Sequence, residues 1–215
     1  MEFGKESGNL CYNFSMANAY IFYGKAGSGK GTQAEMLEQY LISQGKKVVN
    51  IGQGGAFRTF AKDEGYVQGL TRETLNSGKL MPAFMPIYLW SKRLVEDFTG
   101  TEDFVFDGVA RVIEEADILS KALQYLKFEK VFVFHVHISD ETAIERIKSR
   151  ASIDGNSARA DDLNDASIQT RLDVYKHQVL PIVEYFQSNP TNVFVEINGE
   201  VSVEGVFEQI KQKLL

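Results

Sequence analysis

Cysteine is almost absent from this chain, which has one, Cys11, among its 215 residues. A single cysteine cannot form an internal disulfide or supply the thiolates of a structural zinc site, and its scarcity is compatible with a reducing compartment. Long apolar runs are also missing: runs such as residues 131–134 have the length of a strand. A helix that spans a bilayer needs ~20 apolar residues. The sequence therefore predicts neither a disulfide-stabilised protein nor a membrane partner.

An excess of positive charge is lacking as well. The net charge of −6 at pH 7 predicts no nucleic-acid partner, although it permits a locally positive cleft. The 44% apolar and 24% charged residues are typical of a globular protein, and the length suits one α/β domain with small inserts. Residues 1–15 are polar and show no periodicity, so we interpret them as a flexible tail, with Met16 as a candidate natural start.

Strand-like apolar runs alternate with helical patterns along the rest of the chain. Strands are expected at residues 19–23, 47–51, 104–106, 131–138 and 193–197. Helices are expected at residues 32–44, 112–127, 143–150, 166–187 and 203–214. This alternation predicts an α/β fold with a parallel five-stranded sheet, helices on both faces, and a ligand site at the carboxyl ends of the strands. Residues 56–94 contain several helical segments and no strand, and residues 151–158 form a polar loop.

A glycine-rich run, GKAGSGKGTQ at residues 24–33, lies between the first expected strand and the first expected helix. In this context the pattern G-x-x-x-x-G-K predicts a loop whose inward backbone N–H groups, together with the helix N-terminus, hold phosphate. Lys30 adds a mobile positive charge for the outer phosphates. The run predicts binding of a nucleoside triphosphate through Gly27, Ser28, Gly29, Lys30, Gly31 and Thr32. A switch-type GTPase is disfavoured because the chain has no N-K-x-D motif.

An acidic residue and several arginines complete the chemical pattern. Asp107 follows the strand expected at residues 104–106, where a carboxylate can orient water bound to Mg²⁺. Phosphoryl transfer requires two negative substrates held in line and their developing charge neutralised. Arginines from several elements can meet that requirement, and six are placed to do so: Arg58, Arg111, Arg146, Arg150, Arg159 and Arg171.

These motifs resemble the adenylate kinases and related nucleoside monophosphate kinases over most of the chain. The form G-K-G-T-Q, in which Gly31 separates Lys30 from Thr32, is similar to the phosphate loop of that family. Further matches are GQGGAFR at 52–58, GKLMP at 78–82, DGVAR at 107–111, ERIKSR at 145–150, RADD at 159–162 and RL at 171–172. The chain departs from the family pattern at Ala26, Gln53, Gly55, Ala110 and Glu115.

The resemblance implies a P-loop nucleoside monophosphate kinase fold with a short lid. It divides a single kinase domain, residues 16–215, into a core (16–52, 95–150 and 159–215), a monophosphate-binding insert (about 53–94) and a lid (about 151–158). The lid has no cysteine and so resembles the type without zinc. The lid is expected to close over ATP and the insert over the monophosphate. A cytoplasmic monomer with Mg²⁺ as its cofactor is expected.

The resemblance also implies a role for each residue. Arg146 lies along the base of ATP, Asp107 holds Mg²⁺ through water, and Asp161 and Asp162 help to latch the lid. The monophosphate site contains Gln53, Gly54, Arg58, Gly108, Arg111, Glu115, Arg159 and Arg171. The catalytic residues are Lys30, Arg111, Arg150, Arg159 and Arg171.

The implied activity is that of an adenylate kinase, the reversible transfer of the γ-phosphoryl group of ATP to AMP to give two ADP. Two alternatives remain: an acceptor with another base, such as UMP, CMP or GMP, and a catalytically weak nucleotide-binding module. Glu115 bears on the first of these, because an ionised carboxylate only accepts hydrogen bonds and suits guanine better than adenine. Alternatively, Glu115 points to solvent and Gln53 or the backbone recognises the base.

Ala110 occupies a position where the family usually has a proline after a cis peptide bond. A cis bond before a residue other than proline costs about 2.5–4 kcal/mol. We therefore expect the peptide bond between Val109 and Ala110 to be trans. The neighbouring backbone should then adjust so that Arg111 still reaches the phosphate.

Overall fold

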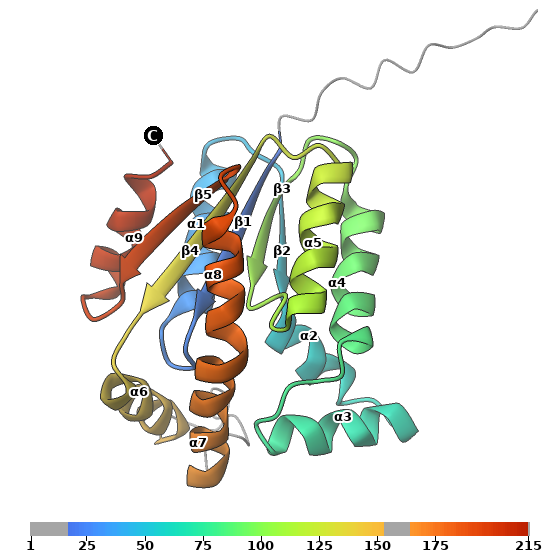
Figure 1. Cartoon of the computed structure of the whole chain (residues 1–215), viewed down its shortest axis with the longest axis vertical. Coiled ribbons are helices and arrows are strands. Elements are labelled where there is room, and N and C mark those ends of the chain that lie inside the picture. The colour runs from blue at the N-terminus through green and yellow to red at the C-terminus, as the bar shows by residue number, and fades with distance from the viewer. Residues whose placement is uncertain (1–16, 153–163, 215) are drawn as a thin grey trace, which may run out of the picture.

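The computed structural model describes residues 17–152 and 164–214 (Figure 1). The expected tail, residues 1–15, lies outside this range, as do Arg159, Asp161 and Asp162. The first two residues of the expected lid belong to a helix that continues to Ser152, and residues 153–158 lie outside the described residues.

Five strands form one sheet: β1 (Asn18–Gly24), β2 (Val48–Gly52), β3 (Asp103–Asp107), β4 (Lys130–His137) and β5 (Asn192–Asn198). Their order is β2-β3-β1-β4-β5, and every neighbouring pair is parallel. The predicted α/β fold is therefore confirmed. The register pairs Asp107 with both Phe22 and Gly52, which brings the carboxyl ends of β1, β2 and β3 together.

Alternate side chains of the strands enter two apolar layers, because successive residues of a strand point to opposite faces of the sheet. On one face Ile21 packs in a cluster with Trp90 of α4 (Phe84–Asp97) and with residues of α5 (Ile113–Tyr125) and α8 (Leu180–Ser188). On the other face Phe22 packs with residues of α1 (Lys30–Ser43) and α9 (Val203–Lys211). The strands are thus covered on both faces, as an all-parallel sheet requires.

The helix predicted over residues 166–187 is not regular throughout. It consists of α7 (Asp165–Val174), a π-helical turn η2 (Tyr175–Val179) and α8. Pro181 is the second residue after the turn and has no N–H to donate, so the α-helical hydrogen-bond pattern is broken there. Such π turns are frequent at functional sites, and this one borders the cleft described below.

The segment between β2 and β3 consists of α2 (Gln53–Phe60), α3 (Tyr66–Asn76) and α4, with no strand among its described residues. Phe57, Met81 and Met85 form a small apolar cluster of its own. In Figure 1, α3 lies at the same end of the molecule as α6 (Asp140–Ser152) and α7, at the carboxyl ends of the strands. Within the described residues, no helix is both long and apolar enough to cross a bilayer.

Candidate active site

The glycine-rich loop connects β1 to the first turn of α1, as the sequence predicts. Gly27 and Gly29 adopt φ values of +82° and +83°, a left-handed conformation that glycine takes without steric cost. A Cβ atom on Gly27 would lie 2.8 Å from the carbonyl oxygen of Ala143 in α6, whereas one on Gly29 would meet nothing within 4 Å. Gly27 is therefore required both by its conformation and by the close approach of α6.

Two lysines hold the ends of this loop. The Nζ atom of Lys30 donates a hydrogen bond to the carbonyl oxygen of Lys25 at 3.2 Å, across the loop. Lys25 in turn donates to the carbonyl oxygen of Ile138 at 2.8 Å and pairs with Asp140 at 2.5 Å. Lys25 therefore ties the loop to the start of α6. The sequence reasoning missed this residue because it occupies a variable position of the motif, and its partners are known only from the fold.

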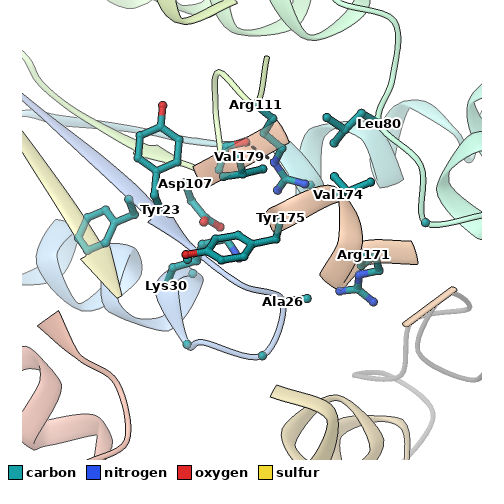
Figure 2. A pocket seen from close by; sticks show the side chains of 18 of the residues that line it. Tyr23, Ala26, Lys30, Leu80, Asp107, Arg111, Arg171, Val174, Tyr175 and Val179 are labelled. Atoms are coloured by element: carbon teal, nitrogen blue, oxygen red, sulfur yellow. Dashed lines mark hydrogen bonds between the residues drawn. The ribbon is translucent and has the colours of Figure 1, made fainter. Parts of the chain in front are cut away.

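A cleft of about 290 Å³ opens at the carboxyl ends of the strands (Figure 2). It brings together most of the predicted site residues: Gly27, Gly29, Lys30, Gly31, Thr32, Gly54, Arg58, Asp107, Gly108, Arg111, Arg146, Arg150 and Arg171. Ser28 is buried beneath the loop rather than lining the cleft. Arg159 lies outside the described residues.

The cleft is strongly positive although the chain as a whole is negative. Two lysines and five arginines line it, and Asp107 is the one carboxylate among the described residues of its wall. Figure 2 shows Lys30, Asp107, Arg111 and Arg171 around the same space. The arrangement suits a ligand with several phosphates, since their charge is neutralised from several sides.

Arg111 is held in place by the turn after β3. Its Nε atom donates to the carbonyl oxygen of Gly108 at 2.8 Å. Burial lowers the pKa of the Arg111 guanidinium, while the nearby carboxylates of Asp107 and Glu115 oppose this shift. The side chain thus stays cationic beside the cleft and is available to a phosphate.

The backbone of this turn follows the predicted path. Among the described residues no peptide bond is cis, so the bond before Ala110 is trans, as expected. Ala110 instead adopts a left-handed φ of 58°, and its carbonyl oxygen accepts a hydrogen bond from the Tyr23 hydroxyl at 3.1 Å. Gly108, with a φ of 64°, is also left-handed, so two left-handed residues turn the chain between Asp107 and Arg111.

Asp107 has the properties of an outer ligand for a divalent cation. Its Oδ1 atom is buried and has no hydrogen-bond partner among the described residues. Its Oδ2 atom lies 3.1 Å from where a Cβ on Gly31 would be, so it faces the start of α1. Oxygen ligands suit Mg²⁺, which usually keeps several waters and takes few protein ligands. The described residues contain no group of three or more His, Cys, Asp or Glu that could hold a metal alone.

A second, smaller pocket of about 60 Å³ adjoins the cleft, and Gly54, Leu75, Lys79, Leu80 and Arg111 line both. Glu115 and Gln53 lie in the smaller pocket, with exposed fractions of 2% and 6%. The interpretation in which Glu115 points to solvent is therefore wrong. Its Oε2 atom accepts a hydrogen bond from the backbone N–H of Arg111 at 3.4 Å, and burial raises its pKa to about 7.

Tyr175 is a further cleft residue that the sequence did not reveal. It belongs to the π turn and lines the cleft, and its hydroxyl lies 2.5 Å from Nε2 of His135. Nδ1 of His135 lies 3.1 Å from Oε1 of Glu196. The only sequence signal was Pro181, which marks a disturbed helix but not which side chain it turns toward the cleft.

Comparison with known proteins agrees with this geometry. The family model described as adenylate kinase matches residues 22–191. An adenylate kinase from Azobacteroides pseudotrichonymphae is 33% identical over 199 residues, covering 93% of this chain and 97% of that protein. One from Leptospira biflexa is 32% identical over 196 residues, with coverages of 90% and 98%. One from Corynebacterium urealyticum is 31% identical over 188 residues, with coverages of 87% and 94%. The chain therefore belongs to the adenylate kinase family of phosphotransferases.

Proposed function

We propose that the protein transfers the γ-phosphoryl group of ATP to AMP, reversibly, to give two ADP. The observation that carries this proposal is one cleft with a phosphate loop at one side, arginines from α2, α6, α7 and the β3 turn around it, and a smaller pocket beside it. The relatives named adenylate kinase support the same reaction.

In this proposal the two phosphate groups are held from opposite sides of the cleft. The backbone N–H groups of the loop and the ammonium of Lys30 bind the phosphates of ATP. Arg58 and Arg111, which come from α2 and from the turn after β3, bind the phosphate of the acceptor. This separation leaves the transferring group between two anchored substrates, which is the condition for in-line transfer.

The remaining arginines neutralise charge on the transferring phosphoryl group rather than position the two nucleotides. Arg150 and Arg171 line the cleft, and Arg159 is proposed to join them. Negative charge on the transferring group is stabilised by guanidinium groups that are already in place, so little reorganisation is needed during the reaction. The protein supplies no covalent intermediate, because direct transfer between two bound nucleotides needs none.

Asp107 is the residue that would hold Mg²⁺, through water, and its unpartnered buried Oδ1 atom fits that role. The cation would neutralise charge on the phosphates of ATP. The division into core, insert and lid, a monomeric state and a cytoplasmic location are part of the same proposal and rest on the family resemblance.

The test is a coupled assay of ADP formation with AMP, GMP, UMP and CMP as acceptors. Wild-type protein should convert AMP, and Lys30→Ala and Arg111→Ala should each lose activity. Lys121→Ala and Arg93→Ala are matched controls, because these exposed side chains pair with acids on their own helices. They should keep wild-type turnover. Nucleotide binding without turnover of any acceptor would overturn the proposal in favour of a catalytically weak nucleotide-binding module.

A further inference from the structure

Two buried polar side chains, Gln53 and Glu115, line the small pocket beside the cleft. Gln53, from the start of α2, is 6% exposed, and its Oε1 atom has no hydrogen-bond partner among the described residues. Glu115, from the first turn of α5, is 2% exposed and accepts a hydrogen bond from the N–H of Arg111, and a backbone hydrogen bond from Ala110 also favours its charged form. A buried carbonyl oxygen without a donor costs about 1–3 kcal/mol, so this pocket is built for a ligand that brings N–H groups.

Most of the remaining pocket wall is apolar. Phe57, Leu75, Leu80, Met81 and Pro86 line it around the two polar groups. The positive cleft continues directly from it through Gly54 and Arg111, which line both spaces. A molecule that fills both spaces has a planar, hydrogen-bonding group at one end and a phosphate at the other, which is the chemistry of a nucleoside monophosphate.

The charges around Glu115 do not fix it in one protonation state. Arg111 lies on one side and favours the carboxylate, and Lys79, an exposed cation, also lines the pocket. Glu114, the exposed neighbour on α5, favours the neutral acid, and so does burial. Tyr23 on β1 is neutral and directs its hydroxyl to the carbonyl oxygen of Ala110.

We propose that Glu115 sets the acceptor preference by its protonation state, so that the neutral acid selects an adenine monophosphate and the carboxylate selects a guanine monophosphate. This inference rests on the proposed function and adds to it a dependence on pH.

A neutral carboxyl group matches the Watson–Crick edge of adenine. Its O–H donates to the N1 lone pair, and its C=O accepts one N–H of the N6 amino group. The unpartnered Oε1 of Gln53 can accept the second N6 hydrogen. An ionised Glu115 would instead place an oxygen lone pair against the N1 lone pair of adenine, and the two would repel each other.

A carboxylate matches guanine in the same way. It accepts from N1–H and N2–H together, whereas the neutral acid would place its O–H against the guanine N1–H. Sites that hydrogen-bond a polar edge discriminate strongly against an analogue that leaves one of their buried groups unpaired. The two protonation states therefore favour different bases.

The neutral and ionised forms are both populated near neutrality, because burial raises the pKa of Glu115 to about 7. Between pH 6 and pH 8 the neutral fraction of such a group falls from about 90% to about 10%. The apparent affinity of a ligand that needs one form scales with the fraction of that form. AMP should weaken and GMP should strengthen by about tenfold each, so that their ratio changes by up to about 100-fold.

The experiment measures kcat/KM for AMP and for GMP at saturating Mg·ATP, at pH 6, 7 and 8. The ratio of the two is the readout, because the phosphate group titrates near pH 6 in both nucleotides and its effect cancels. Wild-type protein should shift from AMP toward GMP as the pH rises. Glu115→Gln, which can donate and accept at every pH, should keep one ratio that favours AMP. Glu114→Gln is the matched control: it should keep the shift from AMP toward GMP, with the midpoint at a slightly lower pH because Glu114 favours the neutral acid.

The wild-type ratio alone can refute the inference, even if the Gln variant does not fold. AMP turnover with a ratio that does not change with pH overturns this inference and leaves the proposed function intact. The same change in Glu115→Gln as in wild type also overturns it, because another group would then be responsible. No turnover with either nucleotide at any pH overturns the proposed function and the inference together.

Discussion

Burial of Glu115 should make the stability of the whole protein depend on pH, and Glu115→Gln should remove that dependence. The folded protein raises the pKa of this carboxyl from 4.5 to about 7, with burial as the main cause. When a carboxyl group has a higher pKa in the folded protein than in the unfolded chain, its contribution to stability is fully present at a pH below the unfolded pKa. That stability is lost as the pH rises toward and through the folded pKa. The loss should therefore lie between about pH 4.5 and pH 7.

The size of the effect follows from the shift. One pKa unit corresponds to about 1.4 kcal/mol. A shift from 4.5 to about 7 therefore limits the loss to about 3 kcal/mol, of which about 2 to 3 kcal/mol falls between pH 5 and pH 8. This is a large share of the 5–15 kcal/mol that is usual for a folded domain. Glutamine has nearly the same shape and no charge, so the variant keeps the packing and loses only the titration.

The measurement is urea unfolding of wild type, Glu115→Gln and Glu114→Gln at pH 5, 6, 7 and 8. The free energy of unfolding of Glu115→Gln minus that of wild type should rise by about 2 to 3 kcal/mol from pH 5 to pH 8. Other titrating groups cancel in this difference. Glu114 is exposed, so Glu114→Gln should follow wild type within about 0.5 kcal/mol. A difference between Glu115→Gln and wild type that is the same at every pH would show that burial does not perturb Glu115.

Three further predictions test the cleft and the insert. Lys30→Ala and Arg111→Ala should each lower kcat/KM by about 10²-fold or more, because each removes a positive charge from the phosphates, while the circular dichroism spectrum stays unchanged. Rates close to those of wild type would contradict the roles proposed for these two residues. In fluorescence titrations, Gly27→Ala should weaken ATP binding more than Gly29→Ala does. Both substitutions strain the backbone, but only the new Cβ of Gly27→Ala also collides with α6. Equal losses of ATP affinity in the two variants would show that this collision is relieved. A bisubstrate inhibitor should lower amide hydrogen exchange in residues 53–94, and unchanged exchange would count against closure of this insert.

The fold was predictable because its signals are local. Each strand contains a short apolar run, the central strands β1, β3 and β4 are largely buried, and the glycine loop has a spacing that few other structures share. The helical segments between β2 and β3 also follow from glycine and proline positions. The π turn could not be predicted in this way, because a helix can accommodate the missing N–H of Pro181 by a kink, a break or a wider turn.

The candidate site was predictable for residues that bear a charge in a recognised motif. Lys30, Asp107 and Arg111 line one cleft, as expected from strand ends that meet at one edge. Lys25 and Tyr175 were not predictable, since their partners Asp140 and His135 are distant in sequence and have no motif. Their contacts exist only after the sheet has placed β4 beside the loop.

Glu115 shows most clearly where sequence reasoning ends. The sequence identifies a carboxyl group near the base, and the chemistry of a free glutamate gives it only acceptors at neutral pH. The structure encloses that group with 2% of its surface exposed and raises its pKa to about 7, so it can also donate. The same residue can then recognise adenine or guanine, and the choice depends on the proton rather than on the residue type. Burial, which no local pattern encodes, thus decides what hydrogen bonds a residue of known identity can make.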